Sequence, residues 1–155
     1  MPGYKTHLTI GVLSFVSISY AVTMIYPQIL NFTTLFVGLF SCMLGSIFPD
    51  IDTVSKMQRI FYFLAAIFVM LSFLLNNFTI FAIFAALSLI IFVLKHRTIT
   101  HNLIFILILA ASLPIYTYFY HAPFLRESLI AAALFAVGSF SHIFIDYFVS
   151  KILKQ

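Results

Sequence analysis

The sequence predicts an all-α protein, a polytopic membrane bundle of about six transmembrane helices with both termini in the cytoplasm. Three observations predict this fold. First, the chain is 63% hydrophobic and only 8% charged, with a mean hydropathy of +1.15, whereas soluble domains carry about 25% charged residues. Second, apolar runs long enough to cross about 30 Å of hydrocarbon recur along the chain. Third, the basic residues are concentrated in alternate connections between these runs.

The first half of the chain contains three of the expected spans. Their expected ranges are Leu8–Tyr26, Ile29–Phe48 and Ile60–Leu75. We expect the first to be a retained helix, because it is long for a signal peptide and lacks a small-residue cleavage site. The second contains Gly38, Ser41, Gly45 and Ser46, which favour close packing against another helix. Pro49 should end it, since the residue before a proline is displaced from the α region.

The second half contains the other three spans, in a chain that we treat as one domain over residues 1–155. Their expected ranges are Phe78–Leu94, Ile99–Tyr120 and Ser128–Val149. Asn76-Asn77 should form the tight turn before the fourth span. Pro114 should kink the fifth, and His121-Ala122-Pro123 should turn the chain before the sixth.

The charge pattern gives the expected orientation. With six spans, seven of the eight basic residues fall on one face, and only Arg126 falls on the other. The seven are Lys5, Lys56, Arg59, Lys95, Arg97, Lys151 and Lys154. By the positive-inside rule this face is cytoplasmic. The basic residues are scattered and not clustered, so the expected partner is the lipid bilayer and not nucleic acid.

Every aspartate and four of the five histidines should lie on this cytoplasmic face, and we interpret them as candidate metal ligands. They are His7, Asp50, Asp52, His96, His101, His142 and Asp146. A nitrogen and oxygen set without thiolate suits a divalent ion, zinc first, with Mn, Fe or Ni as alternatives. Seven candidates exceed the three that one catalytic zinc needs. Either two metals bind, or some of the seven orient the ligands of one.

The spacing of these residues supports the interpretation. His142 and Asp146 are at positions i and i+4, so they share one face of a helix. Asp50 and Asp52 follow a proline, and on non-helical backbone they could converge on one ion. We expect His96 in a loop and His101 in the first turn of the fifth helix, with Thr98 as its N-cap.

Residues beside the candidate ligands suggest hydrolysis. Arg97, Thr100 and a helix N-terminus adjoin the same place, a setting that suits an anion such as a phosphate group. Asp50 or Asp52 would be the first candidates for the general base. The predicted activity is therefore metal-dependent hydrolysis of a phospholipid or another membrane-adjacent phosphoester, with Asp50, Asp52, Arg97 and Thr100 as the candidate catalytic residues.

Four motifs in order resemble the YdjM-like family of bacterial inner-membrane proteins. They are Thr6-His7, Phe48-Pro49-Asp50-Ile51-Asp52, His96-Arg97-Thr98-Ile99-Thr100-His101 and Ser141-His142-Ile143-Phe144-Ile145-Asp146. The resemblance implies a multi-pass protein of the inner membrane and a metal-dependent hydrolase. It implies polar site residues at the same positions, including Arg97 and Thr100. The chain departs from the family pattern at Ile99, where many members have Gly, and at Asn102, where many have Ser.

Two other functions use the same His and Asp residues. In a proton or metal transporter they would relay the ion, but polar groups should then continue across the bilayer, and the outer halves of the spans contain no acid except Glu127. In a non-catalytic protein the metal would hold the helix ends together. Taken singly, each residue also has an ordinary structural explanation, as a loop, an anchor or an intramembrane hydrogen bond. Their coincidence at one face is what favours a site.

Overall fold

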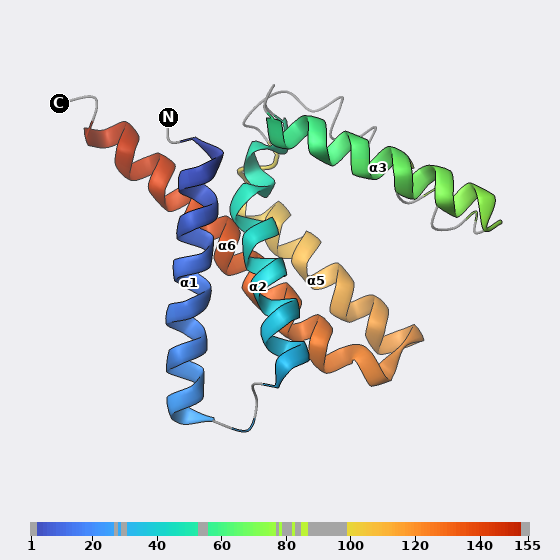
Figure 1. Cartoon of the computed structure of the whole chain (residues 1–155), viewed down its shortest axis with the longest axis horizontal. Helices are drawn as coiled ribbons and strands as arrows, with labels where there is room; N and C mark the ends of the chain where they lie inside the picture. The colour runs from blue at the N-terminus through green and yellow to red at the C-terminus, as the bar shows by residue number, and fades with distance from the viewer. Residues whose placement is uncertain are drawn as a thin grey trace. The chain divides into compact units, whose positions relative to one another are not determined.

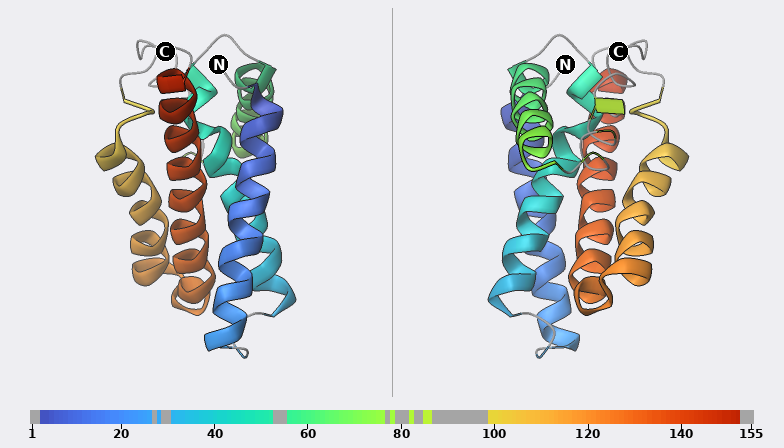
Figure 2. Two further views of the ribbon diagram at one scale, coloured as in Figure 1. Left: turned by 90° about the vertical axis from the view of Figure 1, so that its left-hand side faces the viewer. Right: turned by 90° about the vertical axis from the view of Figure 1, so that its right-hand side faces the viewer.

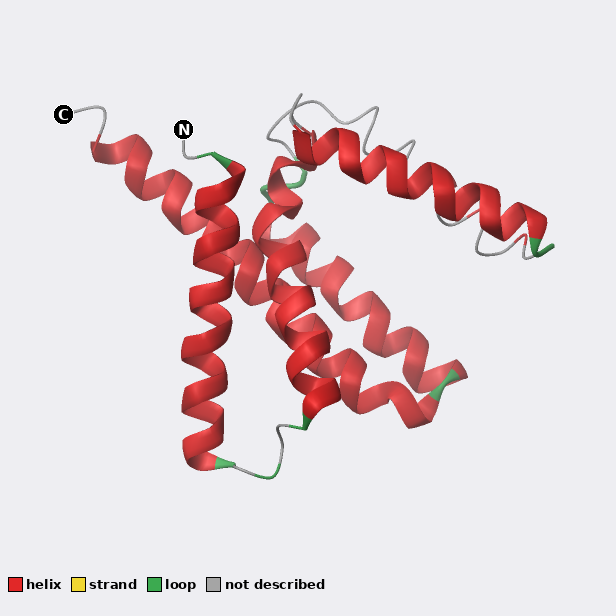
Figure 3. Ribbon diagram, in the orientation of Figure 1, coloured by secondary structure: helices red, strands yellow, loops and turns green. Residues whose placement is uncertain are grey.

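The computed structural model describes residues 3–26, 28, 31–52, 56–76, 78, 82, 85–86 and 99–152. Within these ranges all regular secondary structure is helical (Figure 3), as predicted. The helices are α1 (Tyr4–Ile25), α2 (Phe32–Ile47), η1 (Phe48–Asp52), α3 (Lys56–Leu74), α5 (Leu103–Tyr120), η2 (Ala122–Phe124) and α6 (Leu125–Ile152). Of these, η1 and η2 are short 3-10 helices.

The helices belong to two compact units. One unit comprises Met1–Pro49 with His101–Gln155, and the other comprises Asp50–Thr100. The first unit contains α1, α2, α5 and α6. In it α6 packs against each of the other three helices, and α2 also packs against α1 (Figures 1 and 2). The beginning of α1 and the end of α6 lie at the same end of this unit (Figure 2).

Glycines allow the close crossing of α2 and α6. A Cβ atom on Gly45 would overlap the backbone carbonyl of Phe135, and one on Gly138 would overlap that of Cys42. Ser139 Oγ donates a hydrogen bond across the crossing to the carbonyl of Gly45, at 3.1 Å. Small residues and interhelical hydrogen bonds of this kind replace the hydrophobic effect as the source of helix association in lipid. The prediction that the small residues of the second span pack inward is confirmed for Gly38, Gly45 and Ser46, which are buried.

A third glycine brings α1 against the end of α2. A Cβ atom on Gly11 would lie 2.6 Å from Ser46 Oγ. The thiol of Cys42 donates to the carbonyl of Gly11 at 3.2 Å. Because His7 is one turn before Gly11, this contact carries His7 to the end of the unit where α2 ends.

Four of the described helices are long and apolar enough to span a membrane. Their ranges as candidate spans are Tyr4–Ile25, Phe32–Ile51, Leu103–Tyr120 and Ala122–Lys151, and α3 contains the shorter apolar helix Gln58–Leu74. Most of the fourth expected span, Phe78–Leu94, lies outside the described residues. The total of about six spans and the cytoplasmic position of the termini therefore stay predictions.

Two local predictions were wrong. The chain does not leave helical geometry after Pro49, because η1 continues through Asp52 as a 3-10 helix. The fifth span begins at Leu103 and not at Ile99, because Asn102 is its N-cap. Oδ1 of Asn102 accepts from the backbone N–H groups of Ile104 at 2.9 Å and Phe105 at 3.4 Å. His101 therefore precedes α5 and is not in its first turn, and Thr98 is not its cap.

Candidate metal centre

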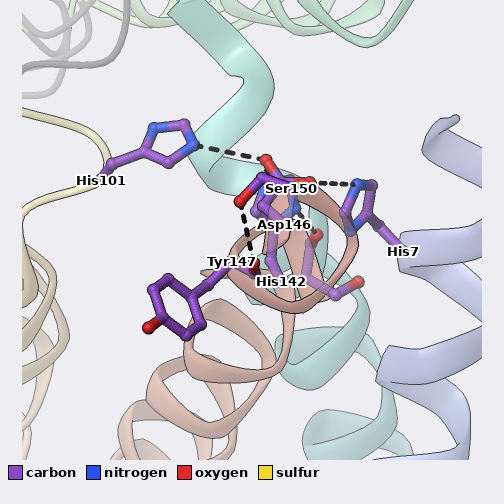
Figure 4. A network of polar contacts seen from close by, with 7 residues as sticks. His7, His101, His142, Asp146, Tyr147 and Ser150 are labelled. Carbon is purple, nitrogen blue, oxygen red and sulfur yellow. Dashed lines mark hydrogen bonds and ion pairs between the residues drawn. The ribbon is translucent and has the colours of Figure 1, made fainter. Parts of the chain in front are cut away.

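The centre of the candidate site is the carboxylate of Asp146 on α6 (Figure 4). Three imidazole Nε2 atoms approach it. Nε2 of His7 on α1 is 3.5 Å from Oδ1, while Oδ2 is 3.7 Å from Nε2 of His142 and 4.0 Å from Nε2 of His101. Residues more than a hundred positions apart in the chain thus meet at one end of the first unit.

The ionisable side chains of this cluster are unusually well buried. His7 and His142 are 1% and 0% exposed, while the side chains of Asp146 and His101 are 14% and 17% exposed. Ionisable groups at the depth of a membrane-spanning helix are costly, and they are usually paired, line a cavity or have a function. Asp146 and His101 are the two more exposed side chains of the group.

The imidazole rings are packed in a fixed arrangement. The rings of His7 and His142 are stacked, with centroids 3.8 Å apart and an interplanar angle of 21°. The ring of His101 meets that of His142 edge-on, at 5.6 Å and 74°. The stack aligns two rings toward the same carboxylate, one at each of its oxygens. Nδ1 of His7 is buried and has no hydrogen-bond partner among the described residues.

A backbone carbonyl fixes the orientation of His142. Its Nδ1 lies 2.7 Å from the carbonyl oxygen of Ser46, in a buried contact between α6 and the end of α2. A carbonyl only accepts, so Nδ1 must carry the proton. In the neutral ring Nε2 then carries the lone pair, and Nε2 is the atom that faces Asp146. This is the usual way in which a second hydrogen bond sets the tautomer of a metal-binding histidine.

The distances suit ligands of one ion better than direct hydrogen bonds. Hydrogen bonds between nitrogen and oxygen are about 2.7–3.2 Å long, and the three separations here are 3.5–4.0 Å. Two ligands at about 2.0–2.1 Å from a tetrahedral zinc are about 3.3 Å apart, and wider angles bring this to about 4 Å. One ligand atom from each of His101, His142 and Asp146 lies within 4.8 Å of the others. This donor set, two imidazoles and a carboxylate, fits a divalent metal ion.

The other predicted site residues are placed as follows. His96 and Arg97 lie outside the described residues. Asp50 and Asp52 are in η1, in the second unit, and Thr100 is buried in the turn before α5. Within the first unit, the structure thus brings together His7, His101, His142 and Asp146. His121, which we expected on the far side, caps the C-terminal end of α5 at the opposite end of the unit.

Three features of the site were missed at the level of sequence. The carbonyl of Ser46 left no signal, because any residue has one. Gly11 is a single small residue in an apolar helix, and nothing marked it as the neighbour of Ser46. Asn102 did carry a signal, since asparagine is among the best N-caps. Its side chain accepts from two N–H groups at the start of α5, groups that we had expected to be available to a substrate anion.

Comparison with known proteins identifies the family. The model of the YdjM inner membrane protein family matches residues 1–151 of the chain. The chain therefore belongs to this family, and the resemblance carried by the four motifs is confirmed. Together with its membrane-length helices, this places the protein in the inner membrane. No curated protein and no solved structure matches the chain.

Proposed function

We propose that this YdjM-family protein is a metal-dependent hydrolase of phosphoesters at the membrane, with its metal held by His101, His142 and Asp146. The observation that supports it most strongly is the convergence of two imidazole nitrogens and a carboxylate oxygen within 4.8 Å. They converge in a chain that is only 8% charged. Convergent polar side chains in an apolar setting are typical of functional sites.

The donor set favours zinc at a catalytic site. Structural zinc sites are closed by four ligands and prefer thiolate, whereas catalytic sites combine three protein ligands with an open position. The three proposed ligands, His101, His142 and Asp146, match the catalytic type. Mn, Fe or Ni would accept the same nitrogen and oxygen atoms.

The residues around the proposed metal have proposed roles of their own. When bound, a divalent ion polarises a phosphoryl oxygen and makes water a better nucleophile. His7 orients Asp146 from the side of Oδ1, and Ser46 orients His142 through its carbonyl. Arg97 and Thr100 are the proposed contacts for the substrate phosphate, and Asp50 or Asp52 is the proposed base.

The proposed substrate is a phospholipid or another phosphoester held at the membrane surface. The cluster lies near the start of α1 and near the end of α6, both of which are candidate spans. We therefore propose that its partly exposed side chains, Asp146 and His101, lie at the level of lipid headgroups. A substrate anchored in the bilayer could present its phosphate there without leaving the membrane.

The first experiment measures the metal content of protein purified from the membrane, for wild type, His101→Ala and His142→Ala. His121→Ala is the matched control, because it removes an imidazole at the opposite end of the unit. We expect bound metal in wild type and in the control, and loss of metal in both site variants. Unchanged metal in both site variants would contradict the proposed site.

The second experiment separates hydrolysis from the two rival functions. Wild type and the two site variants are incubated with phospholipid and with lipid phosphate monoesters in vesicles, and phosphate release is measured. Turnover by wild type alone supports the hydrolase. Metal accumulation inside the vesicles without turnover would indicate a transporter. Site variants that lose the fold, with no turnover by wild type, would indicate a structural metal.

The polar groups of the far half of the first unit give little support to transport. Among the described residues, the buried polar ones there are Thr34, Thr117 and Ser128, and each makes a hydrogen bond. Thr117 and Ser128 bond each other at 2.6 Å, and Thr34 completes the N-terminal cap of α2 with Asn31. Satisfied caps and helix contacts of this kind explain these residues without a path for ions.

A further inference from the structure

Pro49 has no backbone N–H to donate to either of two carbonyl groups near the end of α2. In an α-helix the N–H of residue 49 would bond the carbonyl of Gly45, and in a 3-10 helix it would bond that of Ser46. Proline has no N–H, and Pro49 sits where α2 changes into η1. The ring of Pro49 is fully buried, so water does not supply the missing donor.

Two side chains of α6 supply donors to these carbonyls. Ser139 Oγ donates to Gly45 at 3.1 Å, and His142 Nδ1 donates to Ser46 at 2.7 Å. Ser139 and His142 are three residues apart, so they face the same neighbour from one side of α6. The carbonyl of Gly45 also accepts from the N–H of Phe48. Because Phe48 bonds Gly45, an N–H group at position 49 would bond the carbonyl of Ser46. There it would compete with Nδ1 of His142.

We propose that Pro49 is a positioning residue, which holds His142 in the tautomer protonated at Nδ1. With Ser46 as acceptor, Nε2 carries the lone pair and faces Asp146 at 3.7 Å. The opposite tautomer would set a lone pair against a carbonyl oxygen inside the bundle, where neither group can turn to water. The proline therefore selects the nitrogen that is presented to a metal ion.

The inference concerns the proposed site, but its central observable does not need a metal. The tautomer of His142 can be read in metal-free protein, whereas an effect on metal affinity rests on the proposed function. Partners that orient a metal-binding histidine typically change metal affinity about 10–100-fold. We expect Pro49→Ala to weaken zinc binding by about tenfold or more, because the new N–H competes for Ser46.

The test measures the ¹⁵N chemical shifts of the histidine rings in metal-free protein in lipid nanodiscs, with the His142 signal assigned from its loss in His142→Gln. Pro114→Ala is the matched control, since it makes the same exchange inside α5. A further variant places the α-hydroxy analogue of alanine at position 49. Its ester bond lacks an N–H, as proline does, but has no ring. Zinc affinity is measured on all variants.

We expect wild type, the control and the ester variant to show His142 protonated at Nδ1, and Pro49→Ala to lose this preference. An unchanged tautomer in Pro49→Ala would overturn the proposal, as would an ester variant that behaves like Pro49→Ala. If Pro49→Ala does not fold, a folded ester variant with the Nδ1 proton supports the proposal, and an ester variant that is also unfolded overturns it. The expected tautomers without zinc binding in any variant would refute the metal site and leave the role of Pro49 intact.

Discussion

Asp146 is the residue on which the site depends, because imidazoles approach both oxygens of its carboxylate. Each of its oxygens faces at least one ring nitrogen. A carboxylate accepts but does not donate, and a metal ion or a protonated imidazole is needed to balance its charge. Replacement of this one side chain therefore tests the charge of the site separately from its shape.

Asp146→Asn should lose most of the bound metal. The amide has nearly the same size as the carboxylate, but it lacks the negative charge and presents one oxygen in place of two. We expect metal affinity to fall more than about tenfold, since a ligand matters at least as much as the partners that orient it. Metal titration of the purified protein measures this. Ser150→Ala, on the same helix and exposed, is the control, and equal affinity of all three proteins would exclude Asp146 as a ligand.

His7→Ala distinguishes one bound ion from two. His7 faces Oδ1, whereas His101 and His142 face Oδ2. If His7 only orients Asp146, its loss should weaken binding about 10–100-fold and leave the number of ions per chain unchanged. Metal analysis at saturating concentration gives this number, with Thr9→Ala on the exposed side of α1 as the control. Loss of exactly one of two ions would show instead that His7 is a ligand of a second metal.

The sequence predicted which residues belong to the site better than it predicted their positions. The spacing of His142 and Asp146 on one helix face was enough to pair them, and their nitrogen and oxygen atoms lie 3.7 Å apart. The predicted start of the fifth helix, Ile99, was four residues too early, because Asn102 caps α5, which begins at Leu103, and His101 therefore precedes the helix. The bond to Ser46 could not be predicted, since it depends on how two helices cross.

The crossing of α2 and α6 is the element that positions the site. Ser46 is next to Gly45 on α2, and His142 is one turn after Gly138 on α6. The glycines set how closely the two helix axes approach, and the bond from His142 to Ser46 requires that approach. The small residues of the second span indicated a packed face, but the partner helix could not be read from the sequence.

Gly45→Ala and Gly138→Ala should both destabilise the protein. In each case the added Cβ overlaps a backbone carbonyl of the facing helix, which cannot move aside as a side chain can. Overpacking of this kind costs about 1–3 kcal/mol of unfolding free energy. Unfolding in detergent by heat or denaturant measures it. Gly3→Ala is the control, because nothing lies within 4 Å of its added Cβ. Stability equal to that of the control would contradict the close crossing.

The whole molecule is constrained by the path of the chain through the first unit. Ser46, near the end of α2, and His101, before the start of α5, both lie at the end of the unit that contains Asp146. If the four candidate spans of the first unit cross the membrane, the chain between Ser46 and His101 leaves and returns on the same side. We therefore predict an even number of crossings for residues 50–100, which gives four or six spans in total and not five.

Labelling of single cysteines distinguishes four spans from six. Cys42 is the only cysteine and is buried, so new cysteines can be introduced into Cys42→Ala. The apolar part of α3, Gln58–Leu74, would extend about 26 Å at 1.5 Å per residue, close to the bilayer core. The turn at Asn76, whose φ of 54° ends α3, should then lie on the far side.

We expect an impermeant thiol reagent outside the cell to label Asn76→Cys and His121→Cys, but not Lys5→Cys or Lys151→Cys. Labelling of His121→Cys without Asn76→Cys would show that α3 does not cross. Labelling of the two lysine positions would overturn the cytoplasmic orientation that the basic residues predict.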